Sequence, residues 1–294
     1  MTASIERHWL PGPISTKTDL CLLSLDGGGV RGISSLLILK RLMEGIDREN
    51  PPKPCDYFDM ICGTSTGGLI ALMLGRMRLI VDQCITAYKE LSPKIFTKIH
   101  HRINLLNGET QGRFDHTALE NGVRELLKAY DMEAESLLKG PDEENSCKVF
   151  VCATSQQTGR TAILSSYYNE RRGAEFLDKA TIWQAARATS AATTFFDPIT
   201  IDDETFVDGA TGANNPTNLL WSEAGDIWGH GSGLGLANVR CLVSIGTGVP
   251  ALTSFGPDLP GLKSALQAIA TDTEQTANSF QRDHTELFQK GKAF

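Results

Sequence analysis

The stretch LLSLDGGGVRG, residues 22–32, places three consecutive glycines between an apolar run and a segment with helical spacing. Glycine inside regular structure costs roughly 0.5–1 kcal/mol relative to alanine, so a triple glycine indicates a loop with bare backbone. Such loops present backbone N–H groups to negative charge. That charge is either a bound phosphate or an oxyanion that forms during a reaction.

The composition sets broad limits on the class of protein. The chain has 294 residues, of which 41% are hydrophobic, so it has enough apolar residues for a sizeable core in one large domain or two small ones. A formal net charge of −7 disfavours nucleic acid as a partner. The local basic segment KIFTKIHHR, residues 94–102, is either a solvated surface or a contact for anionic lipid.

Seven cysteines are scattered along the chain without a C-x-x-C pair, which gives no support for a zinc site. The first residues, MTASIERHWLPGP, contain no apolar signal core. No apolar run reaches the length of about 18 residues that a membrane span needs. We therefore expect a reducing, cytoplasmic location.

Strand-like and helix-like segments alternate along the chain. Strands are expected at residues 21–25, before Cys62, and over KVFVCAT, TAILSSY, ETFVD and VRCLVSI. Helical spacing is found around residues 39–46, from about Thr66, over residues 80–91, after a capping Asp115, and over residues 182–192. This mixture predicts an α/β fold in which helices cover both faces of a sheet.

The expected domain organisation is a polar N-terminal arm over residues 1–19 followed by one catalytic domain over residues 20–294. We find no domain boundary before about residue 250. A polar, helical extension from about residue 255 to residue 294 is expected to lead into a longer chain.

The motif GTSTG, residues 63–67, is the one G-x-S-x-G in the chain, with a strand expected before it and a helix after it. This context predicts a nucleophile elbow, in which Ser65 exposes its hydroxyl on a sharp turn made by Gly63, Thr64, Thr66 and Gly67. The N-terminus of the following helix favours negative charge that develops beside the serine.

The glycine loop also fits other readings. Gly27, Gly29 and Gly32 match the G-x-G-x-x-G spacing of dinucleotide sites, with Glu44 or Asp47 in range of a ribose. Asp26 would repel a pyrophosphate, and no Gly-Lys-Ser/Thr follows to make a Walker loop. A third interpretation is an oxyanion hole beside Ser65 in which Gly27, Gly28 and Gly29 supply N–H donors. Nucleotide binding then depends on the glycine spacing alone.

Ser65 needs a base, and two candidates stand out. Asp208, in FVDGA, closes an expected strand, and a partly buried carboxylate of raised pKa can accept the serine proton directly. The other interpretation of Asp208 is an ordinary Asp-Gly turn residue. Among the six histidines, His230 in GHGSGLG is the one serious candidate for a triad base.

These motifs together resemble the patatin-like phospholipase family. DGGGVRG, GTSTGG and VDGA follow one another in the family's order, and ARATSAATTFF, residues 186–196, follows its Ala-rich segment except that Thr193 replaces a proline. NNP, residues 214–216, also matches. The resemblance covers about residues 21–247 and implies a three-layer α/β/α sandwich with a central, mostly parallel sheet.

The resemblance also implies a mechanism. Ser65 and Asp208 would form a catalytic dyad that needs no histidine, metal or cofactor, with Gly27, Gly28 and Gly29 holding the oxyanion and Arg31 bracing the loop. The implied activity is calcium-independent hydrolysis of phospholipid or related acyl esters, of phospholipase A type, by a protein that contacts the membrane peripherally. The alternatives are a regulated effector module with latent lipase activity, followed by C-terminal regulatory domains, and an esterase with a histidine base.

Overall fold

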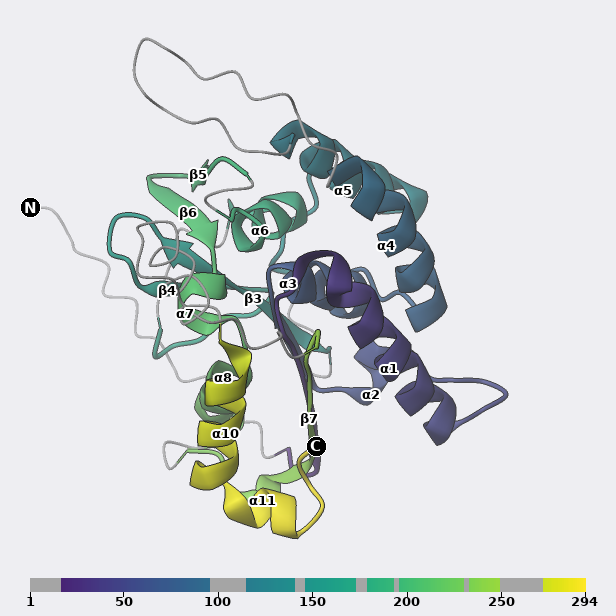
Figure 1. Cartoon of the computed structure of the whole chain (residues 1–294), viewed down its shortest axis with the longest axis vertical. Helices are drawn as coiled ribbons and strands as arrows, with labels where there is room; N and C mark the ends of the chain where they lie inside the picture. The colour runs from purple at the N-terminus through teal and green to yellow at the C-terminus, as the bar shows by residue number, and fades with distance from the viewer. Residues whose placement is uncertain are drawn as a thin grey trace, which may run out of the picture.

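The computed structural model describes residues 17–95, 115–140, 146–172, 179–192, 196–229, 233–248 and 272–294. Within these ranges the chain forms a 7-stranded sheet of order β5-β6-β3-β2-β1-β7, with β4 paired to β3 (Figure 1). The strands are β1 (Leu20–Leu25), β2 (Met60–Thr64), β3 (Lys148–Ser155), β4 (Thr161–Ser165), β5 (Ile199–Ile201), β6 (Glu204–Asp208) and β7 (Val239–Ile245).

Helices lie on both sides of this sheet (Figure 1). Those before β7 are α1 (Gly32–Ile46), α2 (Pro54–Tyr57), α3 (Thr66–Ala71), α4 (Val81–Ile95), α5 (His116–Ala129), α6 (Ile182–Thr189), α7 (Ala210–Ala213) and α8 (Thr217–Trp228). Those after it are α10 (Thr273–Asp283) and α11 (Thr285–Gln289).

Strand direction confirms the expected mostly parallel centre. β1 pairs in parallel with both β2 and β7, and β2 pairs in parallel with β3. The antiparallel pairs are those of β3 with β4, of β3 with β6 and of β6 with β5. The chain's last residues cover the outer edge of β7, because Leu242 N–H donates to the Lys292 carbonyl at 2.7 Å and Phe294 N–H donates to the Leu242 carbonyl at 3.0 Å.

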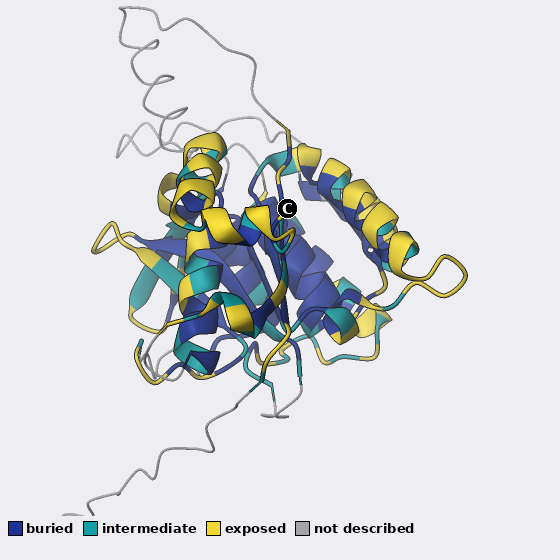
Figure 2. Cartoon of the chain, turned by 90° about the horizontal axis from the view of Figure 1, so that it is seen from below, coloured by how far each residue is buried: buried dark blue, intermediate teal, exposed yellow. Residues whose placement is uncertain are grey.

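Two hydrophobic clusters form on the two faces of the sheet, as the alternation of side chains along a strand requires. Leu23 and Val151 belong to the cluster beneath α1, α3, α4, α5 and α6. Their strand neighbours Leu22 and Phe150 belong to the cluster beneath α8, α10 and α11. Figure 2 shows the buried strands between helices whose outer surfaces are exposed. The three-layer α/β/α arrangement is confirmed.

Local sequence signals account for several helix ends. Asp115 caps α5 as expected, because its side chain accepts a hydrogen bond from Thr117 N–H at 2.8 Å. Thr181 and Gln184 form a capping box at the start of α6. Two expected boundaries were wrong: α6 ends at Thr189 and not at Ala192, and the helix expected over residues 80–91 runs from Val81 to Ile95. The basic segment 94–102 lies outside the described residues except for its first two.

Candidate active site

Ser65 occupies a sharp turn between β2 and α3. Its backbone has φ 54° and ψ −123°, a strained conformation for a residue with a side chain. The turn requires small neighbours, since a Cβ on Gly63 would lie 2.1 Å from the Gly67 carbonyl oxygen and a Cβ on Gly67 would lie 2.2 Å from the Leu25 carbonyl oxygen. The G-x-S-x-G motif therefore forms the expected strand–turn–helix elbow.

Asp208 is brought to this turn by the register of the sheet. On one edge of β3, Cys152 pairs with Thr64, the last residue of β2, and the next residue, Ala153, pairs with Asp208 of β6. β4 pairs with both Cys152 and Ala153, so it occupies the other edge. β2 and β6 thus meet end to end along one edge of β3, and the residues at their ends lie side by side.

The Ser65 hydroxyl donates a hydrogen bond to Asp208 Oδ2 at 2.7 Å. The second carboxylate oxygen of Asp208 accepts from Ala210 N–H at 2.8 Å, and the Asp208 N–H donates to the Ala191 carbonyl at 2.8 Å. Burial raises the pKa of Asp208 from 3.8 to about 6, against the opposing effect of the hydrogen bonds from Ser65 and Ala210. The pair has the geometry and the proton affinity of a nucleophile and its base.

The glycine loop is held by hydrogen bonds to its carbonyl oxygens. The Gly27 carbonyl accepts from Thr247 Oγ1 at 2.9 Å, and the Gly28 carbonyl accepts from Arg31 N–H at 3.3 Å. A trans peptide points its N–H opposite to its carbonyl. The N–H groups of Gly28 and Gly29 therefore point away from these anchors, and they donate to no acceptor among the described residues.

Gly29 is anchored from the helical side of the loop. Its carbonyl accepts from the Thr66 hydroxyl at 2.9 Å and from the Tyr88 hydroxyl at 2.8 Å. Thr66, in the elbow, therefore connects the two motifs directly. Gly29 has φ +59°, which glycine adopts without strain. The N-terminus of α3 and the glycine loop thus form one hydrogen-bonded unit.

The expectation for Gly27 needs a correction. Its N–H donates to the Asn214 carbonyl at 3.0 Å, so it does not have the free donor that an oxyanion hole requires. Gly27 instead permits close approach, because a Cβ there would lie 2.2 Å from Asn214 Oδ1 and 3.3 Å from Ser65 Cβ. Arg31 contacts the loop, since its Nε donates to the Gly28 carbonyl at 3.4 Å.

The acidic residues considered under the dinucleotide-binding hypothesis are not placed to bind a nucleotide. Asp26 is buried, and its Oδ1 has no hydrogen-bond partner within the described ranges. Burial, with a smaller effect from Glu274, raises its pKa from 3.8 to about 8. Glu44 forms an ion pair with Arg41 on α1 at 3.2 Å. In dinucleotide-binding folds an acidic residue near the end of the second strand binds the ribose, whereas here strand β2 is followed by Ser65.

The two histidines that the structure describes, His116 and His284, contact residues outside the Ser65 site. His116 is 4.0 Å from Asp197, and the His284 ring packs against Trp221 and Phe280. His230, the alternative base, lies outside the described residues, as do His8, His100, His101 and Thr193. In the ranges that the structure covers, no group of three or more His, Cys, Asp or Glu residues is arranged as a metal site.

Several residues that complete the site were not predicted from the sequence. Thr189 accepts a hydrogen bond from Ser65 N–H at 2.9 Å, and Asn214 and Thr247 hold the glycine loop. Thr189 and Asn214 lie in the ARATSAA and NNP segments, and the match of these segments to the family pattern was the one indication that they belong to the site. Their contacts depend on long-range packing that these segments do not encode locally.

Fold and site together define an α/β protein in which an elbow serine, a buried carboxylate and a glycine loop meet at one end of a parallel sheet. Comparison with known proteins agrees with this class. The family model described as "Patatin-like phospholipase" matches residues 23–221. The chain belongs to the patatin-like phospholipase family.

Individual relatives are longer than this chain. Phospholipase A I of Arabidopsis thaliana is 29% identical over 83% of this chain and 22% of its own length. Calcium-independent phospholipase A2-gamma of Mus musculus is 31% identical over 86% of this chain and 32% of its own length. The chain thus spans about a fifth to a third of these relatives. The solved structure of VipD from Legionella pneumophila overlaps 90% of this chain and 56% of its own at 15% identity, with a TM-score of 0.38.

Proposed function

We propose that this chain is a lipid acyl hydrolase of phospholipase A type that works through a Ser65–Asp208 dyad. The observation that carries the proposal is the 2.7 Å hydrogen bond from Ser65 Oγ to Asp208 Oδ2 at the sheet end. A serine on a strained elbow, next to a buried carboxylate whose pKa is about 6, is suited to acyl transfer near neutral pH.

In the proposed reaction, Asp208 Oδ2 takes the proton of Ser65 as Oγ attacks the carbonyl carbon of an acyl ester. The tetrahedral intermediate collapses when the ester C–O bond breaks and Asp208 returns the proton to the leaving alcohol oxygen. This leaves an acyl group on Ser65. Water then attacks the acyl carbon while Asp208 accepts its proton, and the proton returns to Ser65 Oγ as the free acid leaves.

The oxyanion of each tetrahedral intermediate needs fixed donors. We assign this role to the N–H groups of Gly28 and Gly29, whose peptide planes are fixed by Thr247 and by Arg31. A donor fixed before the reaction stabilises developing charge without reorganising, and loss of one such donor costs about 2.7–4 kcal/mol of transition-state stabilisation.

The substrate class follows from the family and from relatives named as phospholipases. We propose that the reaction needs no calcium, because the proton transfer and charge stabilisation are assigned to protein groups. No helix among the described residues has the length and apolar character to cross a membrane. We propose that the protein reaches lipid by peripheral contact with a membrane surface, in the cytoplasm.

The proposal is tested by measuring hydrolysis of phospholipid vesicles by Ser65→Ala, Asp208→Asn and His230→Ala. We expect the first two to lose activity by at least about a thousandfold while thermal unfolding remains cooperative, and the third to keep it. Loss of activity in His230→Ala together with full activity in Asp208→Asn would replace the dyad by a histidine-based triad.

The alternative proposal is a module whose lipase activity is latent and regulated by further domains. It is favoured by the length of the relatives, of which this chain spans 22% and 32% in two cases. The test compares the rate of vesicle hydrolysis by this chain with that by a longer chain that contains it. Both rates are expressed per mole of Ser65 that a fluorophosphonate labels. Equal turnover in the two would argue against regulation within one polypeptide.

A further inference from the structure

Thr189 lies at the last position of α6, and its buried hydroxyl makes two hydrogen bonds, one as acceptor and one as donor. It accepts from Ser65 N–H at 2.9 Å and donates to the Cys152 carbonyl at 2.7 Å. A hydroxyl has one proton to donate and lone pairs to accept with, so both functions of Thr189 Oγ1 are used. The residue therefore links the main chain of Ser65 to β3.

The amide of Ser65 depends on this acceptor. Ser65 has left the β2 ladder, which ends at Thr64, and its φ of 54° turns its backbone out of the strand direction. Without this acceptor its N–H would be left without a partner in a closely packed site, which is unfavourable. The Thr189 hydroxyl supplies the acceptor at a place where the sheet no longer does.

The other end of this link lies where Asp208 is held. Cys152 is the β3 residue paired with Thr64, and its neighbour Ala153 is paired with Asp208. The close packing at this point extends to Gly209, where a Cβ would lie 2.5 Å from the Cys152 carbonyl oxygen. One hydroxyl thus connects the backbone of Ser65 to the strand that fixes Asp208.

We propose that Thr189 is a positioning residue of the Ser65–Asp208 pair: its hydroxyl holds the elbow so that Ser65 Oγ stays within hydrogen-bond reach of Asp208 Oδ2. The inference rests on the proposed dyad and assigns Thr189 no contact with substrate. Without the link, Ser65 is free to relax from its strained turn, and small misplacements of a nucleophile are costly, about a hundredfold in rate for a shift of about 1 Å.

The Thr189 side chain also packs against α3. A Cβ on Gly68 of α3 would lie 2.7 Å from Thr189 Oγ1 and 2.8 Å from Thr189 Cγ2, so the hydroxyl and the methyl both fill space there. Thr189→Val keeps this shape and removes the hydroxyl, whereas Thr189→Ser keeps the hydroxyl and removes the methyl. The two variants separate hydrogen bonding from packing.

Ser190 provides a matched control. It is the next residue along the chain and is also buried, but its Oγ has no hydrogen-bond partner among the residues described. Ser190→Ala therefore removes a neighbouring buried hydroxyl that makes no link. Any general effect of deleting a hydroxyl near the end of α6 should appear in both Ser190→Ala and Thr189→Val.

The experiment measures kcat and KM on phospholipid vesicles, and the pH dependence of kcat, for Thr189→Val, Thr189→Ser and Ser190→Ala. Activities are expressed per mole of Ser65 labelled at completion by a fluorophosphonate, which counts folded sites. We expect Thr189→Val to lower kcat by about 10- to 100-fold with little change in KM, and Thr189→Ser and Ser190→Ala to stay within about threefold of wild type.

The pH profile provides a readout that a purely structural role would not move. Burial raises the pKa of Asp208 and the hydrogen bond from Ser65 lowers it, while no charged side chain in the described part of the chain contributes to the shift. Weakening that bond in Thr189→Val should raise the pKa and shift the acidic limb of kcat to higher pH. Thr189→Ser should leave the limb in place.

Several outcomes would overturn the inference. Wild-type kcat and pH profile in Thr189→Val would do so, as would equal losses in Thr189→Val and Ser190→Ala. If Thr189→Val does not fold, Thr189→Ala is measured instead, and failure of both to fold while Thr189→Ser folds would make the residue structural. Full activity in Ser65→Ala or Asp208→Asn would instead remove the dyad itself, which is a distinguishable result.

Discussion

Asp208 experiences two opposing effects at the end of β6. Burial favours its protonated form, while hydrogen bonds from Ser65 and from Ala210 N–H favour its carboxylate, and the balance leaves its pKa at about 6. At neutral pH the carboxylate is thus present, and it is still basic enough to accept a proton in a transition state. A fully exposed aspartate would be ionised but too weak a base, and one buried without hydrogen bonds would stay protonated.

Asp26 is the second buried carboxyl group near the glycine loop, and it gives a testable pH dependence of stability. Its pKa in the folded protein, about 8, lies above the usual 3.8, so the folded state holds this proton more tightly than the unfolded chain. The stability that this provides is complete below about pH 4 and is lost as the pH rises through about 8. Asp26→Asn should therefore flatten the fall in unfolding free energy over this interval.

At pH 8 and above, Asp26→Asn should be more stable than wild type by about 2–5 kcal/mol. Urea denaturation at a series of pH values measures this, with Asp203→Asn on an exposed turn as the control. Parallel stability curves for wild type and both variants would show that Asp26 does not titrate with a raised pKa.

Single residues differed in how well the sequence predicted them. Ser65 stands in a G-x-S-x-G motif and Asp208 in an Asp-Gly turn, and the resemblance of these motifs to the patatin-like family predicts the two as a reacting pair. The engagement of the Gly27 N–H by Asn214 and the contact of Thr189 with Ser65 were not predictable. Each joins residues more than a hundred positions apart, and no local pattern encodes such a contact.

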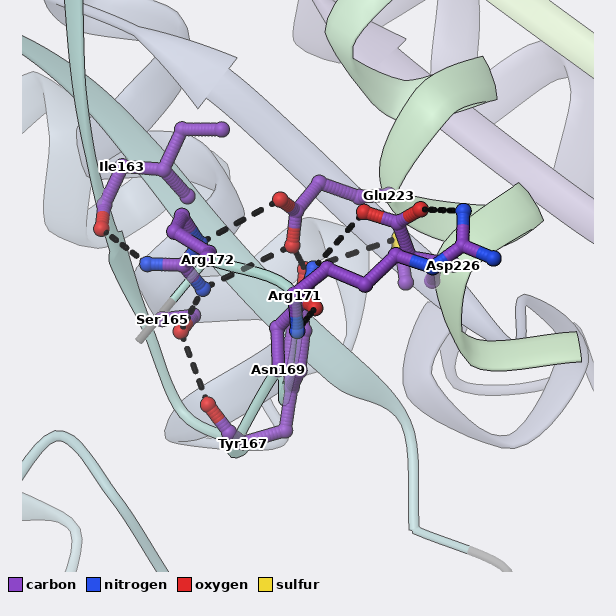
Figure 3. A network of polar contacts seen from close by, with 9 residues as sticks. Ile163, Ser165, Tyr167, Asn169, Arg171, Arg172, Glu223 and Asp226 are labelled. Atoms are coloured by element: carbon purple, nitrogen blue, oxygen red, sulfur yellow. Dashed lines mark hydrogen bonds and ion pairs between the residues drawn. The ribbon is translucent and has the colours of Figure 1, made fainter. Parts of the chain in front are cut away.

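At the scale of elements, α8 is fixed by a buried polar network (Figure 3). Glu223 of α8 accepts a hydrogen bond from the Tyr167 hydroxyl at 2.7 Å and forms an ion pair with Arg172 Nε at 3.3 Å. Arg172 also donates to the Ile163 carbonyl at 2.6 Å. The network ties the segment after β4 to the helix that follows Asn214, whose carbonyl holds the glycine loop.

Removing a buried member of this network should be costly. Glu223→Ala leaves Arg172 and the Tyr167 hydroxyl without their partner, and we expect it to lower the free energy of unfolding by about 3–5 kcal/mol. Asp226→Ala, on the same helix, breaks a more exposed pair with Arg171 and one hydrogen bond from Asn169 at 3.2 Å, and should cost about 1–2 kcal/mol. Chemical denaturation of both variants is the measurement, and equal losses would contradict the assigned difference.

Elements with strong local signals were predicted well, and their junctions less so. The strand before Ser65, the capped helix after Asp115 and the strand ending at Asp208 all appear in the structure. The antiparallel arrival of β6 at the end of β2 did not follow from the sequence, because register is decided by pairing between distant strands.

At the scale of the whole molecule, the sheet separates two cores and brings its functional loops to one end. β1, β2 and β7 run in parallel, so the glycine loop, the Ser65 turn and the Thr247 turn all follow strands at the same end of the sheet. The fold class was predictable because alternating strands and helices demand such layers. The assembled site required the strand order, which one chain's pattern does not specify.

Asp208 is the proposed base for Ser65. The rate constant for fluorophosphonate labelling of Ser65, measured from about pH 4 to about pH 9 in wild type and Asp208→Asn, tests this role. We expect the wild-type rate constant to rise with pH through an apparent pKa of about 6. The rate constant for Asp208→Asn should be at least about a hundredfold lower and should show no such rise. A folded Asp208→Asn protein with the wild-type rate constant and pH profile would show that Asp208 is not the base.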